Sequence, residues 1–163
     1  AKELTKQYHS RVPFVKQLMQ GVQRRLEDPR SSGSVRSLGG RKCRFDLWEP
    51  DTFQMHKAMP YEEAVAAHGP TTRLRRAYTY KALNRLIQAS AADMTKQAMV
   101  DIYQSGKTPL LQVHDELAFS VSSEKEAIGY AEAMEKAIKI KVPCKCDIDY
   151  GPSWGEAAPL ERS

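Results

Sequence analysis

The chain has 163 residues and a formal net charge of +5, from 25 lysines and arginines against 20 aspartates and glutamates. This length predicts one domain with a modest core, and the positive charge suits a partner rich in phosphate. No apolar run is long enough to cross a membrane and no secretory leader is evident, which predicts a soluble, cytoplasmic chain without a membrane partner. The three cysteines follow no zinc-binding spacing and are expected to be reduced and structural.

The first segment has the spacing of an amphipathic helix. Its apolar residues recur every three or four positions, which predicts a helix over residues 1–28. Pro13 lacks a backbone N–H and collides with the preceding turn, so we expect a break near residues 10–13.

A glycine pair marks the next element. The segments 34–38 and 42–47 flank Gly39-Gly40, which predicts a hairpin because glycine tolerates the positive φ of a tight turn. The stretch that follows, up to Pro70, contains three prolines, and within it only residues 61–68 favour a short helix.

A long helix is predicted over residues 73–104. At about 100° per residue its apolar stripe should face the core. The stripe consists of Leu83, Ile87, Met94, Ala98 and Ile102. Asn84 and Gln88 lie on the neighbouring polar face beside small alanines, which leaves room for a ligand. Taken alone, these two amides fit a solvated helix surface.

Residues 110–121 contain the strongest candidate for a functional site. Two short apolar runs enclose His114, Asp115 and Glu116, which predicts a hairpin with ionisable residues at its tip. An isolated carboxylate is too costly to bury, so the two acids should lie at an exposed turn or hold a cation. Ordinary solvated turn residues explain the triplet equally simply. The His-Asp pair of a metal phosphohydrolase is disfavoured, because no other histidine stands in a ligand pattern.

The end of the chain completes an α+β fold. Ser123 and Glu126 fit a capping box that opens a helix to about residue 139. A last strand over residues 144–150 should pair beside the hairpin of residues 110–121. We therefore expect one antiparallel sheet, made of the two hairpins and this strand, with helices packed on one face.

Two motifs in this order resemble the C-terminal palm of family A DNA polymerases, the bacterial DNA polymerase I and T7-like phage enzymes. The segment Gln112-Val113-His114-Asp115-Glu116 resembles their motif C, and residues 84–93 resemble the N-x-x-[IL]-Q-x-x-x-A-D pattern of the preceding helix. Residues 37–42 look like the T-L-x-G-R-[RK] turn, and residues 151–154 look like the terminal G-x-x-W segment. Residues 41–50 have a phage-like look, whereas residues 46–70 are longer than in the bacterial enzymes.

The resemblance implies a fold and a set of roles. Residues 1–163 would form the C-terminal part of the palm, with residues 1–30 as the helix leaving the fingers and residues 46–70 as an insert. Asp115 would bind metal, Glu116 would be an auxiliary acid and His114 would position the primer end. Primer-template DNA would be contacted by Asn84, Gln88, Gln112, Lys81, Arg76 and Arg41. The implied reaction is nucleotidyl transfer from a dNTP to a primer 3′-hydroxyl with two Mg²⁺ ions.

Two patterns of the family are missing from these residues: motif A, D-x-S-x-I-E-x-R, and the nucleotide-gripping fingers helix. We therefore expect activity only with a partner polypeptide or preceding segment that carries motif A, the fingers and the thumb. A phage-encoded chain would work in the host cytoplasm. The alternatives are a noncatalytic DNA-binding palm module and a structural scaffold whose acidic turn is incidental.

Overall fold

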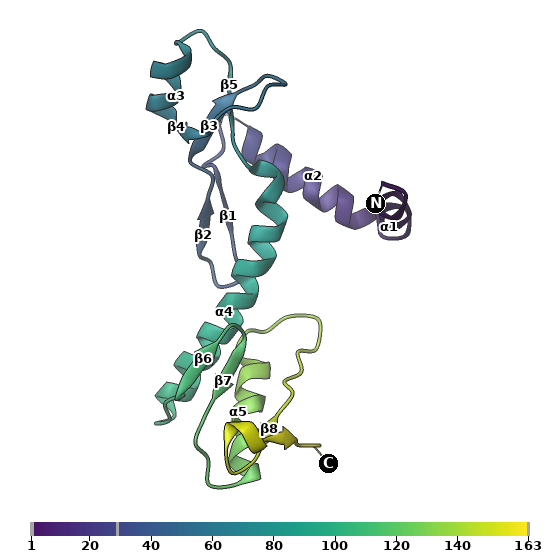
Figure 1. Cartoon of the computed structure of the whole chain (residues 1–163), viewed down its shortest axis with the longest axis vertical. Helices are drawn as coiled ribbons and strands as arrows, with labels where there is room; N and C mark the ends of the chain where they lie inside the picture. Colours follow the sequence, from purple (N-terminus) through teal and green to yellow (C-terminus); the bar gives the residue numbers. More distant parts are fainter. Residues whose placement is uncertain (1, 29, 163) are drawn as a thin grey trace. The chain divides into compact units, whose positions relative to one another are not determined.

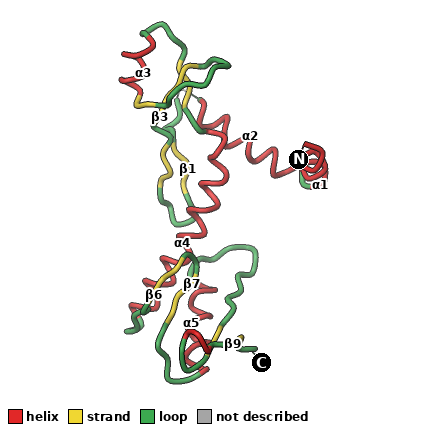
Figure 2. Tube along the Cα trace, in the orientation of Figure 1, coloured by secondary structure: helices red, strands yellow, loops and turns green. Residues whose placement is uncertain are grey.

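The computed structural model describes residues 2–28 and 30–162, in which helices and short antiparallel strands are both present (Figures 1 and 2). This confirms the predicted α+β class. The contacts divide the chain into two compact units, residues 1–88 and 89–163, and the boundary falls inside helix α4. Each unit contains buried side chains and a hairpin of its own.

Unit 1 begins with two helices, α1 (Lys2–Arg11) and α2 (Pro13–Glu27). Pro13 stands in the first turn of α2, where its missing N–H costs no hydrogen bond. Val12 leaves the helical conformation, with φ −130° and ψ 63°. The predicted break is therefore confirmed.

The core of unit 1 is small and joins three elements. Strands β1 (Ser34–Arg36) and β2 (Lys42–Arg44) pair antiparallel, which confirms the first predicted hairpin. The buried cluster consists of Leu26, Val35, Phe45 and Ala82, with Val22, Cys43 and Leu86 packed against it. Cys43 is a free thiol at the edge of this cluster, in keeping with a structural role.

Residues 47–76 form a second sheet, in the order β4-β3-β5. Its strands are β3 (Leu47–Pro50), β4 (Met59–Pro60) and β5 (Leu74–Arg76), and α3 (Tyr61–His68) lies where the sequence predicts a helix. The prediction that the long helix begins at residue 73 is wrong, because Leu74–Arg76 pairs with β3 instead. Charged and aromatic cross-strand pairs, Glu49 with Arg75 and Trp48 with Arg76, favour the strand over the helix.

Helix α4 (Ala82–Gln104) follows the short 3₁₀ turn η1 (Thr79–Lys81). Within unit 1 its inward residues are Ala82 and Leu86, whereas Ile87 is 57% exposed, so the predicted stripe is wrong at that position. Within unit 2 the predicted Ala98 and Ile102 are buried. The helix therefore changes its buried face between its two ends, which a single fixed stripe cannot describe.

Unit 2 contains the hairpin β6 (Leu111–Val113) and β7 (Glu116–Ala118), followed by α5 (Glu124–Lys136). Both were predicted. Near the end, β8 (Asp149–Tyr150) pairs with β9 (Ala158–Pro159) around the 3₁₀ turn η2 (Trp154–Glu156), not with the hairpin.

The expected single sheet is therefore wrong: the strands among residues 2–28 and 30–162 form four separate antiparallel sheets. Within the predicted strand, the Ile148 carbonyl oxygen accepts from the Leu160 N–H at 2.8 Å and so extends the β8–β9 pairing, whereas residues 144–147 lie outside any strand. Polar contacts hold Cys146 instead. The backbone N–H of Cys146 donates to the Glu135 carboxylate at 2.8 Å, and Arg162 donates to the Cys146 carbonyl oxygen. Trp154, in η2, is 70% exposed.

Candidate active-site hairpin and nucleic-acid interface

The β6–β7 hairpin turns over His114 and Asp115, because Val113 pairs with Glu116. All six side chains from Leu111 to Glu116 are exposed. The Gln112 side-chain amide donates to the His114 carbonyl oxygen, which ties the turn to its own strand. The carboxylates of Asp115 and Glu116 therefore lie at an open tip, as the cost of burying them predicts.

His114 has φ +54°, in the left-handed region. Two-residue hairpin turns require a positive φ at their first residue, and glycine is the usual choice there. An imidazole side chain at this point is a strained conformation, of the kind that clusters at functional sites.

The tip carries two carboxylates whose chemistry can be compared with that of a metal site. Within the portion of the chain that is described, no group of three or more His, Cys, Asp or Glu side chains could hold a metal ion. Two adjacent carboxylates are nevertheless the oxygen ligands that Mg²⁺ prefers, and this ion commonly takes only one or two from a protein. The donor set therefore fits a shared magnesium site, in which phosphates, waters or another segment complete the coordination.

The base of the hairpin is held by Glu126, in the first turn of α5. Its Oε1 accepts from Lys107 Nζ at 2.7 Å and from the Tyr130 hydroxyl at 2.7 Å, and its Oε2 accepts from the Ser122 N–H at 2.8 Å. These bonds lower the pKa of Glu126 from its usual 4.5 to about 2, with the Lys107 bond the largest cause. The sequence predicts only the capping role of Glu126. Its hydrogen-bond partners, Lys107 and Tyr130, are not predicted from the sequence.

A second group of candidates lies in unit 1, at the start of α4. Asn84 and Gln88 are exposed and one helical turn apart, as predicted. The Lys81 ammonium lies 5.0 Å from the centre of the Tyr78 ring and 5.6 Å from that of Tyr80, within cation–π range. The two tyrosines were missed, although their alternation with Lys81 in the sequence could have indicated an aromatic and basic face.

The two arginine candidates differ in exposure: Arg76 is half-buried and Arg41 is exposed. Arg76 Nη1 donates to the Phe45 carbonyl oxygen at 3.1 Å, Nη2 donates to that of Ser31 at 3.4 Å, and the guanidinium lies 4.4 Å over the Trp48 ring. A side chain at Gly33 would collide with this guanidinium. Arg76 is thus committed to acceptors within the protein, and its DNA contact stays a prediction.

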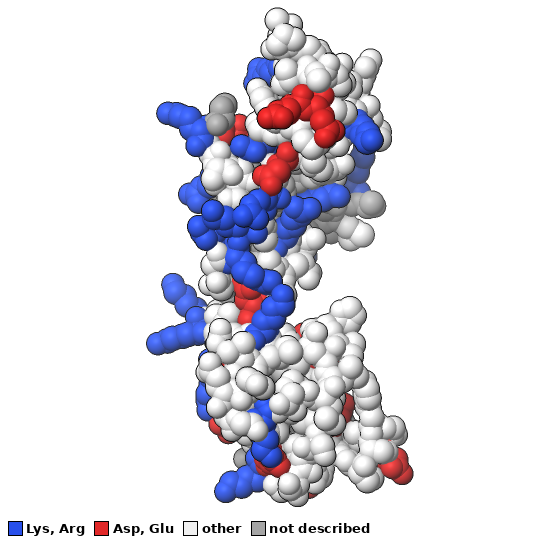
Figure 3. Space-filling view, turned by 90° about the vertical axis from the view of Figure 1, so that its left-hand side faces the viewer, with Lys and Arg blue, Asp and Glu red and all other residues white. Residues whose placement is uncertain are grey.

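Arg41 is exposed in the β1–β2 turn. Figure 3 shows a face of unit 1 on which lysines and arginines gather. The exposed basic residues of this unit around the hairpin and α4 are Arg24, Arg36, Arg41, Lys42, Arg44, Lys81 and Arg85. Such a face suits a phosphate backbone.

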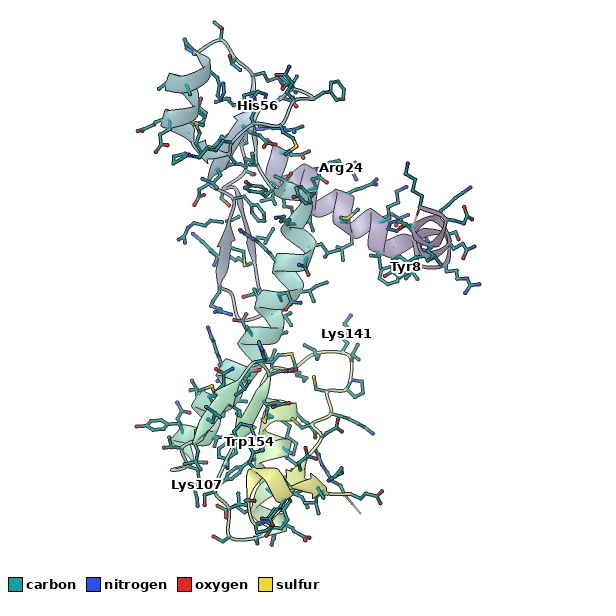
Figure 4. All side chains as sticks on the ribbon, viewed as in Figure 1. Tyr8, Arg24, His56, Lys107, Lys141 and Trp154 are labelled. Atoms are coloured by element: carbon teal, nitrogen blue, oxygen red, sulfur yellow. The ribbon has the colours of Figure 1, made fainter. Side chains whose placement is uncertain are left out.

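The structure thus brings His114, Asp115 and Glu116 together at one tip in unit 2, and Lys81, Asn84 and Gln88 together on one helix face in unit 1. Lys107, labelled in Figure 4, comes from the turn that follows α4 and belongs to the unit of the hairpin. No helix among the described residues combines the length and apolar character that crossing a membrane requires.

Comparison with known proteins identifies the class of protein. The family model of DNA polymerase family A matches residues 1–156, nearly the whole chain. The chain belongs to this family.

Relatives come from phage and bacteria. The chain is 34% identical over 150 residues to a DNA-directed DNA polymerase of Pseudomonas phage M6, covering 92% of this chain and 19% of that protein. It is 30% identical over 168 residues to the thermostable DNA polymerase I of Thermus caldophilus, covering 94% of this chain and 18% of that protein. To the DNA polymerase I of Bacillus subtilis it is 44% identical over 85 residues, 47% of this chain and 10% of that protein. The chain thus spans about a fifth or less of these relatives.

Proposed function

We propose that this chain supplies the C-terminal palm of a DNA-directed DNA polymerase, which transfers a nucleotide from a dNTP to a primer 3′-hydroxyl. The observation that carries the proposal is the pair of open carboxylates, Asp115 and Glu116, beside a strained His114 in a chain of family A. A turn of this kind concentrates negative charge where divalent cations and phosphates can reach it.

The side chains at the tip have separate roles. Asp115 holds magnesium through its carboxylate, and Glu116 is an auxiliary acid beside it. His114, at the exposed turn, donates a ring N–H to the sugar or phosphate at the primer end. Mg²⁺ held there would lower the pKa of the 3′-hydroxyl, polarise the α-phosphate and neutralise the charge of the pyrophosphate.

The α4 face of unit 1 binds the primer-template duplex in this proposal. Asn84 and Gln88 donate to the minor-groove acceptors, purine N3 and pyrimidine O2, that every base pair presents. Such contacts test the shape of a pair without selecting a sequence, as template copying requires. Lys81 and Arg41 contact phosphates, and Gln112 steadies the primer strand while holding the His114 turn. Arg76 orders the surface around them through its carbonyl contacts.

The domain assignment is part of the proposal. Residues 1–30 correspond to the helix that leaves the fingers, and residues 46–70 form an insert in the palm. One exposed tip offers too few carboxylates to hold two ions. A partner polypeptide or another segment therefore supplies motif A, the fingers and the thumb, and the assembly works in the cytoplasm, that of the host if a phage encodes it.

Primer extension tests this proposal. The purified chain should not extend a primer in Mg²⁺ and dNTPs, whereas the chain assembled with a segment carrying motif A and the fingers should. Robust extension by the chain alone would contradict the requirement for that segment. DNA binding without extension by the assembly would favour the noncatalytic module. Absence of salt-dependent DNA binding in an anisotropy titration would favour the structural scaffold.

A further inference from the structure

The catalytic hairpin has little support of its own. Residues 111–116 are all exposed, and Leu117, Ala118 and Phe119 are only half-buried. Two isolated strands are marginally stable in water, so something outside the hairpin must hold it. The contacts that do so lie at its base, where both strands end.

The entering strand is tied down through Lys107. Helix α4 ends in a Schellman motif, in which the Lys107 N–H donates to the Ile102 carbonyl oxygen at 3.3 Å and Gly106, at φ +89°, donates to that of Tyr103 at 2.9 Å. This cap fixes the backbone of Lys107, and its ammonium then meets Glu126 Oε1 at 2.7 Å. The start of the hairpin is thereby attached to α5.

The leaving strand is tied to the same carboxylate. The Ser122 N–H donates to Glu126 Oε2, and the Tyr130 hydroxyl donates to Oε1. The Tyr130 ring in turn stacks on Phe119, directly after β7, with centroids 4.5 Å apart. Because a single carboxylate joins the two ends, any rotation of the hairpin relative to α5 must stretch at least one of these contacts.

We propose that Glu126, with Lys107 and Tyr130, positions the hairpin so that the Asp115 carboxylate meets the metals and the primer end. We call these three residues the base clamp. The inference rests on the proposed function. None of the three touches substrate in it, so they are positioning residues.

The length of the hairpin gives the size of the effect. The distance along the strand from the Leu110–Ala118 hydrogen bond to the turn is about four residues, or ~13 Å at about 3.3 Å per residue. A rotation of ~5° at the base therefore moves the Asp115 carboxylate by ~1 Å. Misplacement of a reacting group by about 1 Å can cost ~10²-fold in rate. Weakening the clamp should thus lower turnover far more than binding.

Hydrogen exchange tests the clamp directly on the chain. Glu126→Gln is nearly isosteric and removes the charge, and Lys107→Met keeps the stem without touching the α5 cap. The matched control is Glu132→Gln, which breaks a 2.7 Å ion pair to Lys136 on the same helix but has no described contact with the hairpin. We expect the Leu110 amide to exchange about tenfold faster in the first two variants, because the two strand ends are no longer joined and their separation opens its bond to Ala118, and to exchange at the wild-type rate in the control. Equal exchange in all three would overturn the clamp.

Kinetics of the assembled polymerase test whether the base clamp affects catalysis. Glu126→Gln and Lys107→Met should lower kcat by about 10- to 100-fold with KM for dNTP and Kd for DNA within about twofold, and Lys107→Arg should recover most of the rate. A merely structural role would lower the active fraction, which the amplitude of a single-turnover extension measures, and leave the rate constant of the active molecules unchanged; that result would overturn the inference. If the wild-type assembly does not extend primers, the proposed function fails, while the exchange data still decide whether the clamp exists.

Discussion

The β1–β2 and β6–β7 hairpins of this chain have turns of different length and use them in opposite ways: five residues separate Arg36 from its partner Lys42, and two separate Val113 from its partner Glu116. In β1–β2, Gly40 supplies the positive φ of +82°, Ser37 is buried and accepts from the Arg41 N–H at 3.1 Å, and Val35 enters the core. In β6–β7 a histidine takes the positive φ, and no side chain from residue 111 to 116 is buried. The relaxed turn supports a basic face, and the strained turn exposes an acidic one. The comparison teaches that the catalytic candidate is the hairpin that gains least from its own packing.

The largest effect should come from the tip of the strained hairpin. Asp115→Ala should lower primer extension by the assembled polymerase by at least about 10³-fold, because the carboxylate that holds magnesium is lost, with DNA affinity nearly intact. Single-turnover extension and anisotropy measure the two quantities. Asp147→Ala, which removes an exposed carboxylate of the same unit, should leave both unchanged. Near wild-type turnover in Asp115→Ala would remove the catalytic assignment.

Among these variants, the largest loss of folding stability should come from a change near the β1–β2 hairpin. Arg76→Ala should destabilise unit 1 by about 2–4 kcal/mol, because it removes two charged hydrogen bonds to carbonyl oxygens and the contact with Trp48. Urea unfolding measures the loss. Lys57→Ala, an exposed basic residue of the same unit, should change stability by less than about 0.5 kcal/mol. Equal stability of the two variants would show that the Arg76 contacts contribute nothing.

Replacing the strained residue should separate stability from activity. His114→Gly should stabilise unit 2 by about 0.5–1 kcal/mol, because glycine avoids the left-handed cost of about 1–2 kcal/mol but loses more chain entropy. It should also lower turnover, since the group that positions the primer end is gone. His114→Asn, which tolerates the same φ, serves as the control. Destabilisation by glycine would argue that the turn is not strained.

A substitution in the β1–β2 hairpin should change DNA affinity but not folding stability. Arg41→Ala should weaken DNA binding several-fold and reduce the slope of log K against log salt by about 1, because one phosphate contact is removed. The free energy of unfolding of this variant should stay within about 0.5 kcal/mol of the wild-type value. Fluorescence anisotropy between 50 and about 200 mM salt gives the slope. An unchanged slope would place Arg41 outside the interface.

The smallest effect concerns pH. The pKa of Glu126 is about 2 in the folded chain against 4.5 ordinarily, so the unfolded chain binds more protons between these values. The contribution of Glu126 to stability is therefore fully present above about pH 4.5 and is lost as the pH falls toward 2. Glu126→Gln should flatten the acid limb of the stability curve relative to the wild type. Parallel acid limbs would contradict the assigned contacts.

Much of the local structure was predictable. The break at Pro13, the Gly39-Gly40 turn, the short helix at residues 61–68 and the Ser123 cap each follow from chemistry within a few residues. The open acidic tip was predictable too, because burying adjacent carboxylates is too costly. The family membership followed from two motifs in the right order.

The sequence by itself thus determined most of the helices, the two hairpins, the acidic tip and the family, since turns, caps and the cost of burying charge act between near neighbours. Only the tertiary structure decided that residues 74–76 form a strand, that residues 144–147 lie outside any strand and that Arg76 is held by carbonyl oxygens. It also joined Lys107 to Glu126 across 19 positions of the chain. The physical reason is that such contacts depend on which segments meet in space, which no periodicity within one segment records.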